Sequence, residues 1–347
     1  MGMNEAAEIL FEKRGVAGIV TLNRPQALNA LTHGMAVALH AQLKDWAADD
    51  GVKCVIVQGA GERAFCAGGD IRTLYDSGKA GTGYAVDFYR DEYLLNATIK
   101  HYPKPYIALI RGFVMGGGVG VSVHGSHRIA DEATVFAMPE TGIGLFPDVG
   151  GSFFLPRLPG EIGMYLGLTG ARLKAGDAVY AGVATHFVPA KQREALIEKL
   201  CGGEVVAVAL RELAEDAPEA PLAAVREKID VAFAAHSVDG VLERLERDGS
   251  DWALDAAKAI RGKSPTATRL AFRQLRKGTN LSFDGCMRME FRMVNRVIAG
   301  HDFYEGVRAT IIDKDGKPKW QPPSLAEVSE ADIDHYFLPL GERELPL

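Results

Sequence analysis

Three consecutive glycines, Gly116, Gly117 and Gly118, followed by Val119 and Gly120, constrain this chain more than any other segment. A glycine inside a helix costs roughly 1 kcal/mol relative to alanine, so such a run is expected only where the backbone approaches another group closely or takes an unusual dihedral angle. Residues 104–110, just before the run, are typical of a buried strand. The pattern predicts a strand that leads into a helix start whose N–H groups face an anionic oxygen.

A second glycine-containing turn supplies a matching set of N–H groups. The apolar stretch at residues 53–58 predicts a buried strand, and the chain then runs on to Ala67, Gly68 and Gly69. The N–H groups of Gly69 and Gly117 would converge on one carbonyl oxygen and stabilise the negative charge that develops on it. Composition alone favours the alternative of two closely packed turns.

Strand and helix signals alternate over the first 200 residues. Residues 9–22 predict a hairpin, and Thr32 is expected to cap a helix that has one apolar face. Residues 127–130 and 134–137 predict two more short strands. This alternation favours a mixed α/β domain with layered sheets.

The character of the chain changes near Glu204. Alanine, leucine, arginine and glutamate dominate from there, and Ser264 with Pro265 predicts the start of a new helix. The charged runs in this region are expected to be solvated helix faces. We therefore predict two parts, a core at residues 1–203 and a helical C-terminal region at residues 204–347.

Composition excludes several classes of function. The net charge of -6 and the lack of a basic run argue against a nucleic-acid partner. No apolar run approaches the length of a membrane span, and the first eight residues lack the pattern of a secretory signal, so we expect a cytoplasmic protein. The four cysteines are widely spaced, which predicts reduced thiols and no structural zinc.

Several motifs, in order, resemble the crotonase (enoyl-CoA hydratase/isomerase) superfamily. They lie at residues 23–25, 28–31, 67–70, 116–118 and 139–140. Within that superfamily, residues 65–72, 138–151 and 301–320 resemble the 3-hydroxyisobutyryl-CoA hydrolases, so the likeness spans nearly the whole chain. The resemblance implies a crotonase-like spiral of ββα units, an acyl-CoA thioester as substrate, and Gly69 and Gly117 as its oxyanion hole.

The same resemblance implies which carboxylates act. Glu140 matches the glutamate that attacks the thioester or activates water, Asp148 matches an aspartate near the hydroxyacyl group, and Glu92 matches a substrate-contacting position. The apolar loop around Glu140 would raise its pKa and suit it to proton transfer. The alternatives are a loop carboxylate bonded to nearby amides for Glu140, a helix N-cap for Asp148 and an exposed helical residue for Glu92.

Further residues and partners follow from the resemblance. Ala67, Gly68, Asp70 and Gly116 are expected to bind the substrate. No cofactor or metal is expected, because coenzyme A is part of the substrate, and related enzymes form trimers or multiples of trimers. We expect hydrolysis of a short-chain 3-hydroxyacyl-CoA, with 3-hydroxyisobutyryl-CoA in valine breakdown as the first choice.

Two other functions stay open. An enoyl-CoA hydratase or isomerase would share the fold, but hydratases commonly carry a second glutamate where this chain has Gly120. A non-catalytic acyl-CoA-binding protein is the alternative from another class, because a fold alone does not determine chemistry.

Overall fold

The structure is a computed structural model that describes residues 7–347. The chain forms two compact units, each assembled from three segments. Unit 1 contains the described residues up to Gly69 together with Leu94–Phe136 and Leu173–Ala220. Unit 2 contains Asp70–Tyr93, Ala137–Arg172 and Pro221–Leu347. The predicted boundary between residues 203 and 204 stays a prediction.

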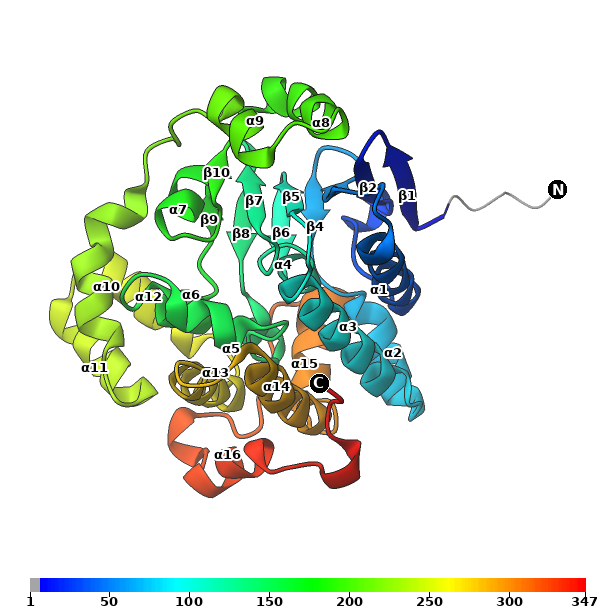
Figure 1. Ribbon diagram of the computed structural model, residues 1–347. Helices are drawn as coiled ribbons and strands as arrows, with labels where there is room; N and C mark the ends of the chain where they lie inside the picture. The colour runs from blue at the N-terminus through cyan, green and yellow to red at the C-terminus, as the bar shows by residue number, and fades with distance from the viewer. Residues whose placement is uncertain (1–6) are drawn as a thin grey trace. The chain divides into compact units, whose positions relative to one another are not determined.

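Unit 1 is built on a six-stranded sheet with the order β1-β2-β3-β5-β7-β10 (Figure 1). The first two strands form the predicted antiparallel hairpin, and β2, β3, β5, β7 and β10 pair in parallel. The strand bounds are β1 Ile9–Arg14, β2 Ala17–Leu22, β3 Cys54–Gly59, β5 Tyr106–Ile110, β7 His127–Ala130 and β10 His186–Phe187.

Both faces of this sheet are buried along its strands β2, β3 and β5. On one face, alternate residues such as Ile19, Ile56 and Ile107 form a single apolar cluster with helices α8 (Arg193–Cys201) and α9 (Val206–Leu213). The intervening residues, such as Val20 and Val57, are also buried. Parallel strands covered on both faces need nearly continuous apolar sequence, which explains why residues 53–58 predicted a buried strand.

Helix α1 (His33–Ala48) is capped as predicted. The Thr32 hydroxyl accepts a hydrogen bond from the N–H of Met35 at 3.2 Å. The buried face of the helix carries Met35, Leu39, Leu43 and Trp46. A Cβ on Gly18 would lie 2.6 Å from the Trp46 ring, so strand β2 needs glycine at that point.

A second sheet in unit 1 carries both predicted glycine turns. Its order is β4-β6-β8-β9, with bounds β4 Ala64–Cys66, β6 Phe113–Met115, β8 Val135–Ala137 and β9 Leu173–Lys174. The chain enters the glycine run from β6, and helix α4 spans only Gly117–Gly120. Ser122 already lies in the turn after α4, and its hydroxyl donates to the Gly118 carbonyl at 2.7 Å.

The predicted C-terminal helices are present, and most of them belong to unit 2. The Ser264 hydroxyl caps α13 by accepting from Ala267 N–H at 3.0 Å, and α16 packs against α14 (Figure 1). The helices of unit 2 are α2 Ile71–Ala80, α5 Gly151–Phe154, α6 Ile162–Thr169, α10 Arg226–Phe233, α11 Val238–Asp248, α12 Asp251–Arg261, α13 Pro265–Gly278, α14 Phe283–Val297, α15 Asp302–Val307 and α16 Glu330–Phe337.

Helix α3 (Tyr84–Lys100) is the one described helix whose residues are divided between the two units. Helix α7 (Ala175–Tyr180) belongs to unit 1, and α3 contributes its first ten residues to unit 2 and the rest to unit 1. The four cysteines are free thiols, as their spacing predicted, and all four are buried.

Candidate active site

The two glycine turns predicted to form an oxyanion hole are neighbours in unit 1. Strands β4 and β6 pair in parallel with Cys66 opposite Val114, so the chain leaves both strands at the same edge of the sheet. A Cβ on Gly118 would lie 2.1 Å from the Cys66 carbonyl oxygen. The alternative of two closely packed turns is therefore correct for Gly118. Only a hydrogen atom fits at the position that a Cβ would occupy there.

Two N–H groups at this edge are available to a ligand. Within residues 7–347, neither the N–H of Gly69 nor that of Gly117 donates a hydrogen bond to the protein. The N–H of Gly117 is the first of α4 and has no intrahelical partner for that reason. Gly68 has a φ of 126° and Gly116 a φ of 46°, conformations that favour glycine.

The other predicted substrate-binding residues are engaged as follows. Ala67 N–H donates to the Leu28 carbonyl at 3.0 Å, and Gly68 carbonyl accepts from Leu31 N–H at 2.8 Å. Asp70 belongs to unit 2 and caps α2, because its Oδ1 accepts from Thr73 N–H at 3.3 Å. Their contacts with a substrate stay predictions, as does that of Gly116.

Glu140 lies in unit 2 at the first position of a short 3-10 helix, η2 (Glu140–Ile143). Its side chain is 4% exposed, although it is a glutamate in a loop. The loop is fixed by main-chain contacts: Ser264 N–H donates to the Thr141 carbonyl at 3.2 Å, and a Cβ on Gly306 would lie 2.4 Å from Ile143. A buried carboxylate on a rigid support suits a reacting group.

A lysine that the sequence reasoning missed, Lys263, interacts electrostatically with Glu140. Burial lowers the pKa of Lys263, and the negative charge of Glu140 opposes that shift. The Lys263 ammonium also lies close to the loop, because a Cβ on Gly142 would be 3.4 Å from its Nζ. Lysine at the end of a solvated helix gave no signal of this proximity in the sequence.

Asp148 forms a buried cluster with Glu92 and Tyr93 in unit 2. The Tyr93 hydroxyl donates to Asp148 Oδ2 at 2.9 Å, and Glu92 precedes Tyr93 on α3. Asp148 is 4% exposed and Glu92 only 2%. The exposed alternative for Glu92 is therefore wrong. The N-cap alternative for Asp148 is wrong too, because the N-cap of α5 is Gly150 and the Asp148 carboxylate bonds Tyr93.

Burial raises the pKa values of the carboxyls in this cluster and so favours their neutral, protonated forms. It raises the pKa of Asp148 to about 7, while the hydrogen bond from Tyr93 lowers that pKa. Burial also raises the pKa of Glu92 well above its usual value, and the charge of Asp148 adds to the increase. Two carboxyls that share a buried space cannot both ionise at low cost, so one proton between them is favoured near neutral pH.

Glu290 is a third buried carboxyl that the sequence reasoning missed. It lies on α14 and burial raises its pKa to about 8, while hydrogen bonds from Ser152 and Gly150 lower it. A signal existed, because Glu290 stands four residues after Cys286 and four before Val294, both buried on the apolar face of the helix. A single glutamate on such a face indicates a partnered buried charge.

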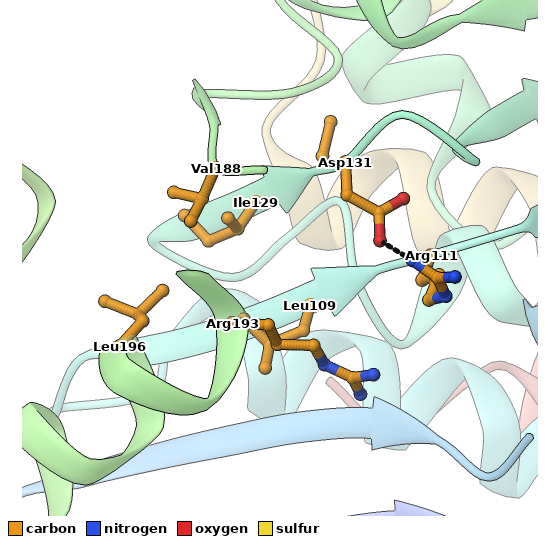
Figure 2. Close-up of a pocket in the computed structure, with 8 residues that line it drawn as sticks. Leu109, Arg111, Ile129, Asp131, Val188, Arg193 and Leu196 are labelled. Carbon is orange, nitrogen blue, oxygen red and sulfur yellow. Dashed lines mark hydrogen bonds and ion pairs between the residues drawn. The ribbon is translucent and has the colours of Figure 1, made fainter. Parts of the chain in front are cut away.

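A separate polar cluster in unit 1 lines a small cavity. Arg111 Nη1 pairs with Asp131 Oδ2 at 2.6 Å, and Arg193 comes from the neighbouring helix α8 (Figure 2). The cavity volume is about 10 Å³, which is room for about one water molecule. The cavity is too small to hold an acyl group.

Among residues 7–347, no helix is both long and apolar enough to cross a bilayer. Within the same residues, no three histidine, cysteine or acidic side chains are grouped so that they could hold a metal ion.

Comparison with curated proteins finds close relatives along the full chain. The chain is 50% identical to the protein named 3-hydroxyisobutyryl-CoA hydrolase, mitochondrial, of Danio rerio, covering 100% of this chain and 94% of the relative. It is 45% identical to the protein of the same name from Homo sapiens, covering 98% and 91%.

Solved structures confirm the predicted crotonase-like fold. A carnitinyl-CoA dehydratase from Mycobacterium thermoresistibile matches with a TM-score of 0.93 and 41% identity, covering 99% of this chain and 98% of that one. An enoyl-CoA hydratase from Rhodobacter sphaeroides matches with a TM-score of 0.93 and 40% identity, covering 98% and 100%. The family model described as enoyl-CoA hydratase/isomerase matches residues 17–337. This chain belongs to the enoyl-CoA hydratase/isomerase family.

Proposed function

We propose that this protein hydrolyses a short-chain 3-hydroxyacyl-CoA thioester, with 3-hydroxyisobutyryl-CoA as the first choice of substrate. The observation that carries the proposal is the identity of 45–50% along nearly the full chain with proteins named as hydrolases of that thioester. The buried carboxyls of Glu140 and Asp148 support it, because they offer two distinct acid–base groups. A setting in valine breakdown is part of the proposal.

The proposed reaction needs two kinds of group: N–H donors that stabilise the oxyanion, and a carboxylate that attacks the thioester or activates water. The N–H groups of Gly69 and Gly117 bind the thioester oxygen and stabilise its negative charge. Glu140 either attacks the thioester carbon or takes a proton from the attacking water. Water adds an oxygen to the acyl carbon, the carbon–sulfur bond breaks, and the leaving thiolate takes up the proton. No cofactor takes part.

Asp148 and Glu92 are proposed to recognise the substrate hydroxyl. Together they retain a proton near neutral pH, so the pair can both donate to and accept from an alcohol. Glu92 Oε1 is buried and, within the described residues, has no hydrogen-bond partner. An unpartnered buried oxygen next to Asp148 is the feature expected of a group that awaits a polar ligand.

The hydroxyl contact is tested with a matched pair of substrates. Isobutyryl-CoA lacks only the hydroxyl group, and thiol release from it should have a kcat/KM about 10- to 100-fold below that of 3-hydroxyisobutyryl-CoA, since an unpartnered buried group costs about 1–3 kcal/mol. Equal kcat/KM values would contradict the assignment of Asp148 and Glu92. An Asp148→Asn variant should reduce the preference for the hydroxylated substrate.

Enoyl-CoA hydration is the second candidate, because solved relatives that are 40–41% identical are named as a hydratase and a dehydratase. The residue at the position of the second hydratase glutamate is Gly120, which has no side chain to act as acid or base. This disfavours hydration relative to hydrolysis.

Compartment and assembly are also proposals. We propose a cytoplasmic location, whereas the vertebrate relatives are named mitochondrial. Fractionation of cells that express the native gene tests it. We further propose a homo-oligomer, which sedimentation of the purified chain tests.

A further inference from the structure

The turn that carries Asp148 has an unusual backbone. Val149 has a φ of 49° and Gly150 a φ of 85°, so two consecutive residues lie in the left-handed region. Valine is branched at Cβ and avoids this region, because its side chain meets the neighbouring carbonyl. Such a conformation persists only where surrounding groups hold it, and it is found most often at functional sites.

Glu290 holds this turn from a distant part of the sequence. Its Oε2 accepts from Gly150 N–H at 2.8 Å, and its Oε1 accepts from Ser152 N–H at 2.9 Å and from the Ser152 hydroxyl. These N–H groups lie at the start of α5, where backbone donors have no partner within the helix. No side chain of the α5 N-cap residue bonds them. Glu290 is therefore the cap of α5, supplied by α14.

The other end of the turn is held in the same way. Gln274 Nε2 on α13 donates to the Pro147 carbonyl at 2.6 Å. A Cβ on Gly278, also on α13, would lie 1.9 Å from the Ser152 carbonyl oxygen, so the helix backbone abuts the turn directly. Asp148 thus stands between two clamps, and only the Glu290 clamp has a group that can ionise.

We propose that Glu290 is a positioning residue for the reaction, which clamps the Val149–Gly150 turn and thereby fixes the carboxyl of Asp148 against Tyr93. This inference rests on the proposed role of Asp148 in the proposed function. Nothing in the catalytic step requires Glu290 to touch the substrate. Its action on Asp148 has two parts, the hydrogen bonds to the turn and the repulsion between two buried carboxylates.

The second part gives the proposal a signature that a merely structural residue would lack. The groups that face Asp148 are Glu92, Tyr93 and Tyr89 from α3 and Glu290 from α14. Ionised Asp148 raises the pKa of Glu290, because like charges repel. Replacing Asp148 with a neutral residue of the same shape should therefore lower the pKa of Glu290 from its value of about 8.

The first experiment measures kcat, KM and their pH profiles for Glu290→Gln with 3-hydroxyisobutyryl-CoA. The amide presents an NH₂ group to one of the N–H donors, so the clamp is broken on that side. We expect kcat to fall at least 10-fold, KM to change less than threefold, and the pH-profile limb near pH 8, where Glu290 ionises, to disappear. Asp284→Asn, the same loss of charge in the first turn of α14, is the matched control and should leave the profile unchanged.

The second experiment does not depend on turnover. A double-mutant cycle of Asp148→Asn and Glu290→Gln, followed by thermal unfolding at pH 6 and pH 9, measures the coupling between the two residues. We expect coupling that grows at pH 9, where both carboxyls are ionised. Coupling without thioesterase activity in the parent protein would refute the proposed function while supporting the clamp.

Two results would overturn the inference. One is an additive cycle at both pH values, and the other is an active Glu290→Gln protein with parental kcat and pH profile. Should Glu290→Gln fail to fold, Ser152→Ala replaces it, because that change removes one donor and keeps both N–H bonds. The limb near pH 8 is then expected to move to higher pH, since the Ser152 hydroxyl lowers the pKa of Glu290, and an unchanged profile would contradict the proposal.

Discussion

At the scale of single residues, replacing Glu140 tests the proposed hydrolysis mechanism most directly. Glu140→Gln keeps the shape of a side chain that is 4% exposed but removes both the nucleophile and the base. We expect kcat to fall at least about 100-fold, because acid–base catalysis typically contributes 10²- to 10⁴-fold. Binding of a CoA ester, measured by calorimetry, should stay within a few-fold of the parent. A kcat near that of the parent would remove Glu140 from the mechanism.

Asp148 should also cost stability, with a definite dependence on pH. Its folded pKa of about 7 lies above the ordinary value of 3.8, so the folded state binds more protons between these values. The contribution of Asp148 to stability is fully present below pH 3.8 and is lost as the pH rises to about 7. Asp148→Asn should therefore raise the melting temperature relative to the parent at pH 8 by more than at pH 5, and an equal difference at both pH values would contradict the shifted pKa.

At the scale of elements, the contact between α4 and β4 carries the glycine turns. Gly118→Ala would place a methyl group 2.1 Å from the backbone oxygen of Cys66, which cannot move without β4. We expect a loss of about 1–3 kcal/mol in the free energy of unfolding, as in other overpacked sites, together with loss of activity. Gly34→Ala, in the open first turn of α1, is the control and should be neutral or stabilising. Denaturant unfolding gives both values, and a neutral Gly118→Ala would show that the contact is relaxed.

The elements also show what sequence patterns can and cannot predict. The β1-β2 hairpin, the Thr32 cap and the Ser264 cap were predictable because each depends on residues within a few positions of one another. The length of α4 was not, because after Gly120 the backbone bonds alternate between i→i−3 and i→i−4 partners and the Ser122 hydroxyl bonds the Gly118 carbonyl. Glu290 was missed for another reason, since its partners lie 138 and 140 residues earlier in the chain.

At the scale of the whole molecule, the resemblance determined more of the site than the residues did. Glu92, Glu140 and Asp148 each had an ordinary alternative, and only the fold shows that all three carboxyls are buried. Burial is a property of long-range packing, so no window of sequence reports it. The glycine run was the exception, because its cost in a helix already required a special environment.

The most direct measurement compares two reactions of the purified parent protein under identical conditions. Release of free thiol from 3-hydroxyisobutyryl-CoA reports hydrolysis, and loss of the enoyl absorbance of crotonyl-CoA reports hydration. With buried Glu140 and Asp148 but Gly120 in place of a second glutamate, we predict that kcat/KM for hydrolysis exceeds that for hydration at least about 100-fold. Rapid hydration of crotonyl-CoA with no thiol released from the hydroxyacyl thioester would contradict the account.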